Sequence, residues 1–463
     1  MGVYDEQFIK PAKTSRDPWN NDRSTSFLDG LRGLAAFIVL VYHFNVGWYG
    51  EEILHGYGDN GHRSFTLLPF VRIFYSGGPA AVAIFFVLSG FVLTISPLRQ
   101  IRDRKPSKQI YQSLLSSVVR RPIRLYLPCL LFVLTTATLR HTPLIPQTPW
   151  PVLQGDVFLE VITAISKFTT FFYPLRQHNV MIPFEYGVHY WTIPIELKGS
   201  MLVFTLVALS AKGASPKWEL LRLLFMGILF HQMGQWAMSL FMFGMCLAIC
   251  EANHFSLTDL SFIDAKFGKY HSELNWTILL LGGWLCSQVD RDINWSLATP
   301  GWYLLTRLTP TVYVDDEYFR FWNGYGAALI VYAVLRIKMI QDFFKLRVLT
   351  WLGKISFVLY LSHTVVFSIV GEVCKRLVGQ ATFFIPGELG TYWYDNKLYM
   401  PDVGPMGLNL RWFGSFALCT SCCLVFAHFG TRIYDHTGVR AARWLSRSLA
   451  LDKPVAAPLP SYR

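Results

Sequence analysis

The sequence is poor in charged residues, which occupy only 16% of its 463 positions. A soluble globular chain is usually about one quarter charged, so this scarcity argues against a string of soluble domains. Intrinsic disorder is excluded as well, because 36 Phe, 22 Tyr and 15 Trp demand burial. The net charge of +12 does not indicate a nucleic-acid binder, since so apolar a chain lacks an open basic face. A polytopic membrane protein fits this composition.

The sequence also lacks the cysteine content of a disulfide-stabilised protein and the start of a secreted one. Eight cysteines in this length do not form a disulfide framework. Cys419 and Cys422, the single C-x-x-C pair, lie in an apolar run, where we expect them to pack as small side chains. Residues 1–26 are polar, unlike a cleavable signal peptide. We therefore expect the first apolar segment to act both as targeting signal and as membrane span.

Ten apolar segments approach the length of about 20 residues that a bilayer-spanning helix needs. The strong candidates are 27–44, 79–95, 125–139, 190–211, 348–372 and 410–430; shorter ones are 235–250, 276–289 and 321–335, and 220–230 is the weakest. The sequence therefore predicts an all-α polytopic membrane protein with about ten transmembrane helices in one bundle. We predict one membrane domain over residues 27–430, flanked by a polar tail over 1–26 and a basic tail over 431–463.

Basic residues gather on one side of the predicted spans, as the positive-inside rule describes. Segment 96–124 carries eight basic residues and one acid, so we expect it, and with it the N-terminus, in the cytosol. The basic C-terminal tail is predicted to be cytosolic too. Connection 251–275 does not support the rule, since its acids outnumber its basic residues. The protein is thus predicted to be a multi-pass protein of the endoplasmic reticulum or the plasma membrane.

Ionisable side chains inside the predicted spans are costly and are functional candidates by default. Asp29, Arg32 and His43 lie in the first span, and Glu196 lies in the fourth. Asp29 and Arg32 are three residues apart, so they share a helix face and can pair. His43 follows Arg32 by eleven residues, roughly 16 Å along a helix and on nearly the same face. Together these side chains predict a polar stripe from the cytosolic boundary past the bilayer centre.

Five motifs, in order along the chain, resemble those of the membrane-bound acyltransferase-3 family. Arg32 and His43 match the Arg-x10-His spacing of the family in a helix that begins with its Asp-x-x-Arg pattern. The other four are FFVLSGF at 85–91, RPIR at 121–124, WTIPIE at 191–196 and GKISFVLYLSH at 353–363. Departures are small, namely Phe357 where a Tyr is common and longer aromatic outer loops. These departures leave the identity of the acceptor open, but they do not affect the expected class of reaction.

The resemblance implies transfer of an acyl group, usually acetyl from acetyl-CoA, to a hydroxyl. The residues fit such a reaction. Arg121 and Arg124 stand where the basic segment re-enters the membrane, and with Arg32 they are predicted to bind the phosphates of acyl-CoA. His43 is predicted to be the general base, since an imidazole can take a proton from an alcohol at neutral pH. Glu196 is predicted either to orient His43 or to hold the acceptor hydroxyl.

Four further motif residues, Asp29, Ser89, Tyr360 and His363, are predicted to support the site. For His363, an interhelical hydrogen bond is as good an explanation as substrate binding, and the Ser89 segment equally predicts close helix packing. Arg121 and Arg124 also fit a role as membrane anchors. His189 is explained by an aromatic belt at the outer interface. No nucleophilic Ser or Cys has a paired base, so direct transfer is favoured, with an acyl-His intermediate left open.

The sequence thus predicts a CoA-dependent O-acyltransferase, an O-acetylation enzyme that tailors a hydroxylated small molecule in secondary-metabolite biosynthesis. Acyl-CoA is the expected co-substrate, with no bound cofactor, no metal site and no nucleic-acid partner; the oligomeric state is left open. Alternatives are O-acetylation of a cell-surface glycan or lipid, a proton-coupled transporter, and a non-catalytic membrane partner. Asn294, in a sequon on the predicted outer side, is a glycosylation candidate.

Overall fold

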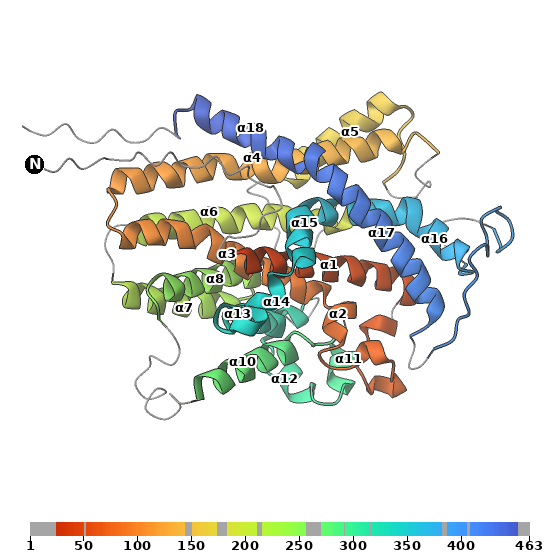
Figure 1. Cartoon of the computed structure of the whole chain (residues 1–463), viewed down its shortest axis with the longest axis horizontal. Helices are drawn as coiled ribbons and strands as arrows, with labels where there is room; N and C mark the ends of the chain where they lie inside the picture. Colours follow the sequence, from red (N-terminus) through yellow and green to blue (C-terminus); the bar gives the residue numbers. More distant parts are fainter. Residues whose placement is uncertain are drawn as a thin grey trace, which may run out of the picture.

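The computed structural model of the chain is a bundle of helices (Figure 1). It describes residues 25–50, 52–143, 151–173, 183–210, 215–255, 270–290, 292–313, 317–381, 387–404 and 408–451. Across these ranges no strand forms, and β pairing is limited to one isolated bridge between Phe184 and Gly187. The all-α class is therefore confirmed for the described residues. Most of the predicted N-terminal tail lies outside them.

Six helical segments are long and apolar enough to cross a membrane. They are α1 (Ser26–Tyr49), α3 (Gly78–Arg102), α4 (Ser107–Leu139), η4 (Val188–Trp191) with α6 (Thr192–Ser210), α15 (Arg347–Val366) with η8 (Phe367–Gly371) and α16 (Glu372–Leu377), and α17 (Leu410–Ile433) with α18 (Asp435–Ser448). These six contain the six segments predicted as strong spans. An integral membrane protein follows from this set of helices.

The four weaker candidate spans are helices as well, but shorter or less apolar ones. They are α7 (Pro216–Gln232), α8 (Trp236–Ala252), α10 (His271–Leu285) and α13 (Phe319–Arg336). Of these, α8 is apolar and 17 residues long. The predicted count of about ten spans is not confirmed by this set, since six helices reach spanning length and hydropathy within the part of the chain that is described.

Within residues 387–404 the predicted outer connection has turns but no helix, whereas the other predicted outer connections contain short helices. They are η1 (Glu52–Leu54), η2 (Asp59–Gly61), η3 (Phe65–Leu67), α2 (Arg72–Ser76), α5 (Val157–Phe171), α11 (Ile293–Ala298), α12 (Tyr303–Arg307) and η7 (Thr311–Tyr313). One more short helix, α14 (Lys338–Phe344), lies in a predicted cytosolic connection. The outer elements bring polar side chains to the end of the bundle, where they matter for the site described below.

Helices α1 and α15 pack with their backbones in direct contact, because glycines face each other across the crossing. A Cβ atom on Gly353 would lie 2.1 Å from the carbonyl oxygen of Asp29, and one on Gly33 would lie 2.4 Å from the nitrogen of Gly353. The two helices are parallel, and His43 and His363 each follow their contact glycine by ten residues. Equal offsets on parallel helices place the two histidines at the same depth, about 15 Å further along.

Helices α3 and α8 cross in the same way, at Gly90 and Gly244. A Cβ atom on Gly90 would lie 2.2 Å from the carbonyl oxygen of Phe241, and one on Gly244 would lie 2.1 Å from that of Val87. The close helix approach predicted for the Ser89 segment is therefore confirmed. Ser89 itself points away from this crossing and lines a cavity.

Part of the predicted C-terminal tail, helix α18, packs against the bundle. Helix α18 runs alongside α4 (Figure 1), and the hydroxyls of Ser116 and Ser446 are hydrogen-bonded at 2.8 Å. The packing face of α18 is small, with Gly438 and Ala442 among its buried residues. All eight cysteines are free thiols.

Candidate active site

The three predicted acyl-CoA-binding residues meet at one cavity. Arg32 of α1 lines it together with Arg121 and Arg124 of α4. The cavity measures about 220 Å³, lies between α1, α3, α4, α6 and α15, and is bordered by Asp435 of α18. We call it the inner cavity, because it lies toward the ends of α1 and α15 that adjoin the predicted cytosolic connections.

Positive charge predominates in the inner cavity, where four basic and two acidic residues line the wall. Arg32 pairs with Asp29 at 3.0 Å, as predicted from their spacing, and donates to the Gly353 carbonyl at 2.8 Å. Arg121 pairs with Glu196 through its terminal nitrogen and donates from Nε to the Ser200 hydroxyl at 2.9 Å. These contacts hold the guanidinium groups in place, so the cavity is prepared for an anionic ligand.

His43 lines a second and larger cavity of about 720 Å³. We call it the outer cavity, because the predicted outer connections contribute to its wall. Its lining is mostly apolar, with aromatic and aliphatic side chains such as Trp191, Phe319 and Val188. Its volume falls within the range of about 300–1,000 Å³ that is typical of small-molecule sites. The two cavities share lining residues, so they adjoin one another.

The hydrogen bonds around His363 assign the tautomer of His43. Nδ1 of His363 lies 2.8 Å from the Tyr360 carbonyl oxygen, so it must carry a proton, and Nε2 is left as an acceptor. Nδ1 of His43 lies 3.2 Å from that Nε2 and 2.9 Å from the Val39 carbonyl oxygen, so it must be the donor to both. The lone pair of His43 is then on Nε2. This is the arrangement that a general base requires.

Glu196 lies in the inner cavity, whereas His43 lies in the outer one. The carboxylate is paired with Arg121, and Ser89 is a further hydrogen-bond partner. The side chain that contacts Nδ1 of His43 is His363, which the sequence placed only among the supporting residues. The catalytic role predicted for Glu196 stays a prediction, and the side chain lies in the wall of the inner cavity beside Arg121.

His189 was explained from the sequence as part of an aromatic belt, and this interpretation is wrong. The side chain is only 3% exposed and lines the outer cavity, and its ring centroid lies 4.5 Å from that of His363. Its Nε2 is buried without a hydrogen-bond partner. Such an atom is costly unless a ligand or water pairs with it. The signal available in the sequence was the position of His189 two residues before the Trp191 motif.

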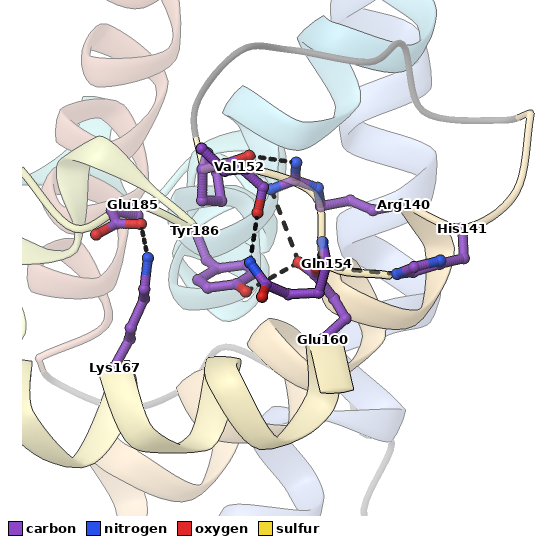
Figure 2. Close-up of polar contacts among 9 residues, drawn as sticks. Arg140, His141, Val152, Gln154, Glu160, Lys167, Glu185 and Tyr186 are labelled. Carbon is purple, nitrogen blue, oxygen red and sulfur yellow. Dashed lines mark hydrogen bonds and ion pairs between the residues drawn. The ribbon is translucent and has the colours of Figure 1, made fainter. Parts of the chain in front are cut away.

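A buried network around Glu160 holds the segment that carries His189 (Figure 2). The Glu160 carboxylate accepts hydrogen bonds from the Tyr186 hydroxyl at 2.9 Å and from the Gln154 backbone at 2.9 Å, with Arg140 3.9 Å and His141 3.8 Å away. Burial, together with the bond to Glu160, raises the pKa of the Tyr186 phenol, which therefore stays protonated and donating. The network ties α4 and α5 to the wall of the outer cavity.

Polar groups of the outer connections complete the outer cavity, and sequence reasoning missed them. The Tyr42 hydroxyl donates to the Asp290 carboxylate at 2.9 Å. The Arg320 guanidinium lies 4.2 Å from the ring centre of Trp236 and 4.7 Å from that of Trp191, and its Nε is 2.7 Å from the Glu317 carboxylate. Asp290 and Glu317 lie in connections without a motif, and Arg320 lies at the start of α13, just before a predicted span. Across the described ranges, no set of three His, Cys, Asp or Glu residues is arranged to hold a metal ion.

Asn294, the glycosylation candidate, lies near the start of α11 and is exposed. Its backbone nitrogen is hydrogen-bonded to the Asp292 side chain, which caps the helix. The Ser296 hydroxyl of the same sequon is buried and bonded to Thr306 at 2.8 Å. The folded site therefore exposes the asparagine but not the hydroxyl, and glycosylation of Asn294 stays a prediction.

The known proteins and the protein family that this chain matches are all described as acyltransferases. Residues 25–428 match a family described as an acyltransferase domain. The chain is 26% identical over 385 residues to an O-acetyltransferase of Phomopsis amygdali, with 76% of this chain and 74% of that protein covered. It is 22% identical over 407 residues to an acyltransferase of Cochliobolus lunatus, covering 74% and 83% of the two chains.

A third relative, an acyltransferase of a Phoma strain, is 23% identical over 408 residues, covering 73% of this chain and 82% of that protein. No solved structure is detectably similar. The matched region contains both cavities apart from Asp435, and it includes each of the five motifs. The chain therefore belongs to the acyltransferase-3 family.

Proposed function

We propose that the protein transfers an acyl group, most simply acetyl, from acyl-CoA to a hydroxyl of a small molecule. The observation that carries this proposal is the pair of adjoining cavities. One is lined by arginines and the other by a histidine whose Nε2 is the basic atom. An anionic acyl donor needs a basic site, and an apolar alcohol needs an apolar one. Acyl transfer between the two requires that the two sites adjoin.

The donor enters the inner cavity from the cytosol, where acyl-CoA is found. A volume of about 220 Å³ is below the range of about 300–1,000 Å³ typical of whole ligands, so it suits the pantetheine arm. The phosphates then lie against Arg32, Arg121 and Arg124. Charge-assisted hydrogen bonds from guanidinium groups are the usual means of holding phosphate oxygens. This orientation directs the thioester toward the outer cavity.

The acceptor binds in the outer cavity with its hydroxyl beside His43. Nε2 of His43 takes the proton of this hydroxyl while the oxygen attacks the thioester carbonyl. The bond between the carbonyl carbon and sulfur then breaks, and the thiolate of CoA takes the proton from His43. The products are the ester and free CoA. Proton transfer by a positioned base contributes about 10²–10⁴-fold to such reactions.

A small molecule suits the outer cavity better than a polymer does. The outer cavity is lined mainly by apolar side chains, whereas a glycan chain needs a polar groove. The relatives are named as an O-acetyltransferase and as acyltransferases, which supports the type of reaction. We therefore place the protein in the tailoring of a hydroxylated secondary metabolite, in a membrane with both termini cytosolic.

Metabolite profiling of a deletion strain tests this function. The account predicts a compound that is lighter by one acyl group in the deletion strain and is restored to the ester by the intact gene. Unchanged compounds that are merely redistributed between cells and medium would contradict the proposal and support a transporter. An acyl group lost from cell-wall glycan instead would move the acceptor to the polymer class.

A further inference from the structure

Three residues line both cavities, and each comes from a different helix. They are Val82 of α3, Thr192 at the start of α6 and Tyr360 of α15. All three are buried, with exposures of 8%, 6% and 8%. No other residue appears in both linings. We call this set the neck.

The order of lining residues along each helix places the neck between the cavities. On α3, Pro79 faces the outer cavity and Ser89 the inner one, with Val82 between them. On the segment leading into α6, Val188 faces the outer cavity and Glu196 the inner one. Both helices begin at the predicted outer side. Along each of them, the lining residues pass from the outer cavity through the neck to the inner cavity.

Hydrogen bonds fix two sides of the neck. The Tyr360 hydroxyl donates to the His189 carbonyl oxygen. The Thr192 hydroxyl lies 2.6 Å from the Tyr360 hydroxyl. Because the single proton of Tyr360 is used on His189, Thr192 is the donor in the second bond. The Tyr190 hydroxyl also donates to the Leu361 carbonyl at 3.0 Å, which ties the two helices together. The third side, Val82, is an apolar side chain that makes no such bond.

This geometry constrains the acyl group. The phosphates of the donor belong with the arginines of the inner cavity, and the base, His43, belongs to the outer cavity. The thioester carbonyl must reach the hydroxyl beside His43, so the acyl chain that precedes it has to pass between Val82, Thr192 and Tyr360. A wall formed by a tyrosine pinned by hydrogen bonds does not widen easily.

We propose that Val82, Thr192 and Tyr360 form a neck that limits the bulk of the acyl group accepted. This inference rests on the proposed acyl-CoA-dependent transfer. Val82 is the member that can be changed without breaking a hydrogen bond. One methylene in an apolar pocket discriminates by about 10–200-fold, so a change of this size at Val82 should alter the choice of donor measurably.

The test compares donors of different bulk in purified full-length protein in lipid nanodiscs. Acetyl-CoA, propionyl-CoA and the branched isobutyryl-CoA serve as donors, and the unacylated compound from the deletion strain serves as acceptor. Val82→Ala should raise the ratio of kcat/KM for isobutyryl-CoA to that for acetyl-CoA by at least about tenfold. Val82→Phe should reduce transfer from every donor, while thermal stabilisation by CoA alone is retained.

Val92→Ala is the matched control, because Val92 lies on the same helix as Val82 but is exposed and lines neither cavity. The ratio should stay unchanged in this variant. Thr192→Ser removes a methyl group and keeps the hydroxyl, so it should shift the ratio in the same direction as Val82→Ala and stands in for it if that variant does not fold. A ratio unchanged in both neck variants, or shifted equally by Val92→Ala, would overturn the neck. Absence of transfer by the unaltered protein would instead overturn the proposed function.

Discussion

At the scale of single residues, the basicity of His43 depends on a chain of two hydrogen bonds. The Tyr360 carbonyl fixes the proton of His363 on Nδ1, and Nε2 of His363 then receives the proton of His43 Nδ1. A histidine in the middle of an apolar helix is costly to bury, and this arrangement gives both rings defined partners. His363 therefore makes an interhelical hydrogen bond, one of the two explanations that the sequence allowed, and in the proposed mechanism this bond orients His43.

Replacing His363 should impair the chemical step rather than donor binding. His363→Phe removes the acceptor for Nδ1 of His43, and a misplaced base can cost about 100-fold in rate. We expect kcat to fall by about that factor, with the KM for acetyl-CoA unchanged. His436→Phe is the control, because His436 is exposed and lies outside both cavities. A fall in donor affinity alone would show that His363 does not act through His43.

The donor side offers a second test with single residues. Arg124 lines the inner cavity, and a hydrogen bond to a charged group is worth about 1.5–3 kcal/mol. Arg124→Gln should therefore raise the KM for acetyl-CoA by at least about tenfold, with kcat at saturating donor nearly unchanged. Arg443→Gln, at an exposed position of α18, should leave the KM as it is. An equal change in KM for the two variants would indicate that Arg124 acts as a membrane anchor and not as a ligand of acyl-CoA.

At the scale of helices, the site depends on the register between α1 and α15. The polar stripe of Arg32 and His43 could be predicted from the sequence, because it follows from spacing within one helix. The contact between His43 and His363 could not be derived from spacing, since 320 positions separate them and the glycine contact between the helices sets their relative height. The outer wall was harder still, because Asp290 lies in a connection and Arg320 in the first turn of α13, both outside the recognised motifs.

A methyl group at the crossing of α1 and α15 should disturb both stability and activity. In Gly353→Ala the new Cβ atom would lie 2.1 Å from a backbone oxygen, which cannot move aside as a side chain would. Overpacking of this kind costs about 1–3 kcal/mol. We expect a lower temperature of unfolding in detergent and reduced transfer. Gly155→Ala is the control, since no atom lies within 4 Å of its new Cβ; equal stability of both variants would contradict the packing described here.

At the scale of the whole molecule, the proposed function places the two substrates in two cavities that differ in chemistry and in side. The net charge of +12 in the sequence becomes, in the folded chain, a basic inner cavity beside an apolar outer one. Six apolar helices surround this path, and the weaker predicted spans pack as shorter helices within the same bundle. Their status could not be decided from the sequence, because length and hydropathy near the threshold do not distinguish a short span from a buried helix.

The most direct test of the account is transfer from isotopically labelled acetyl-CoA by purified protein, with the unacylated compound from the deletion strain as acceptor. The unaltered protein should give labelled ester. His43→Ala should lower the rate by about 10²–10⁴-fold while remaining folded and still being stabilised by CoA. Labelled ester formed by His43→Ala at the rate of the unaltered protein would contradict the central claim that His43 is the base of an acyltransferase.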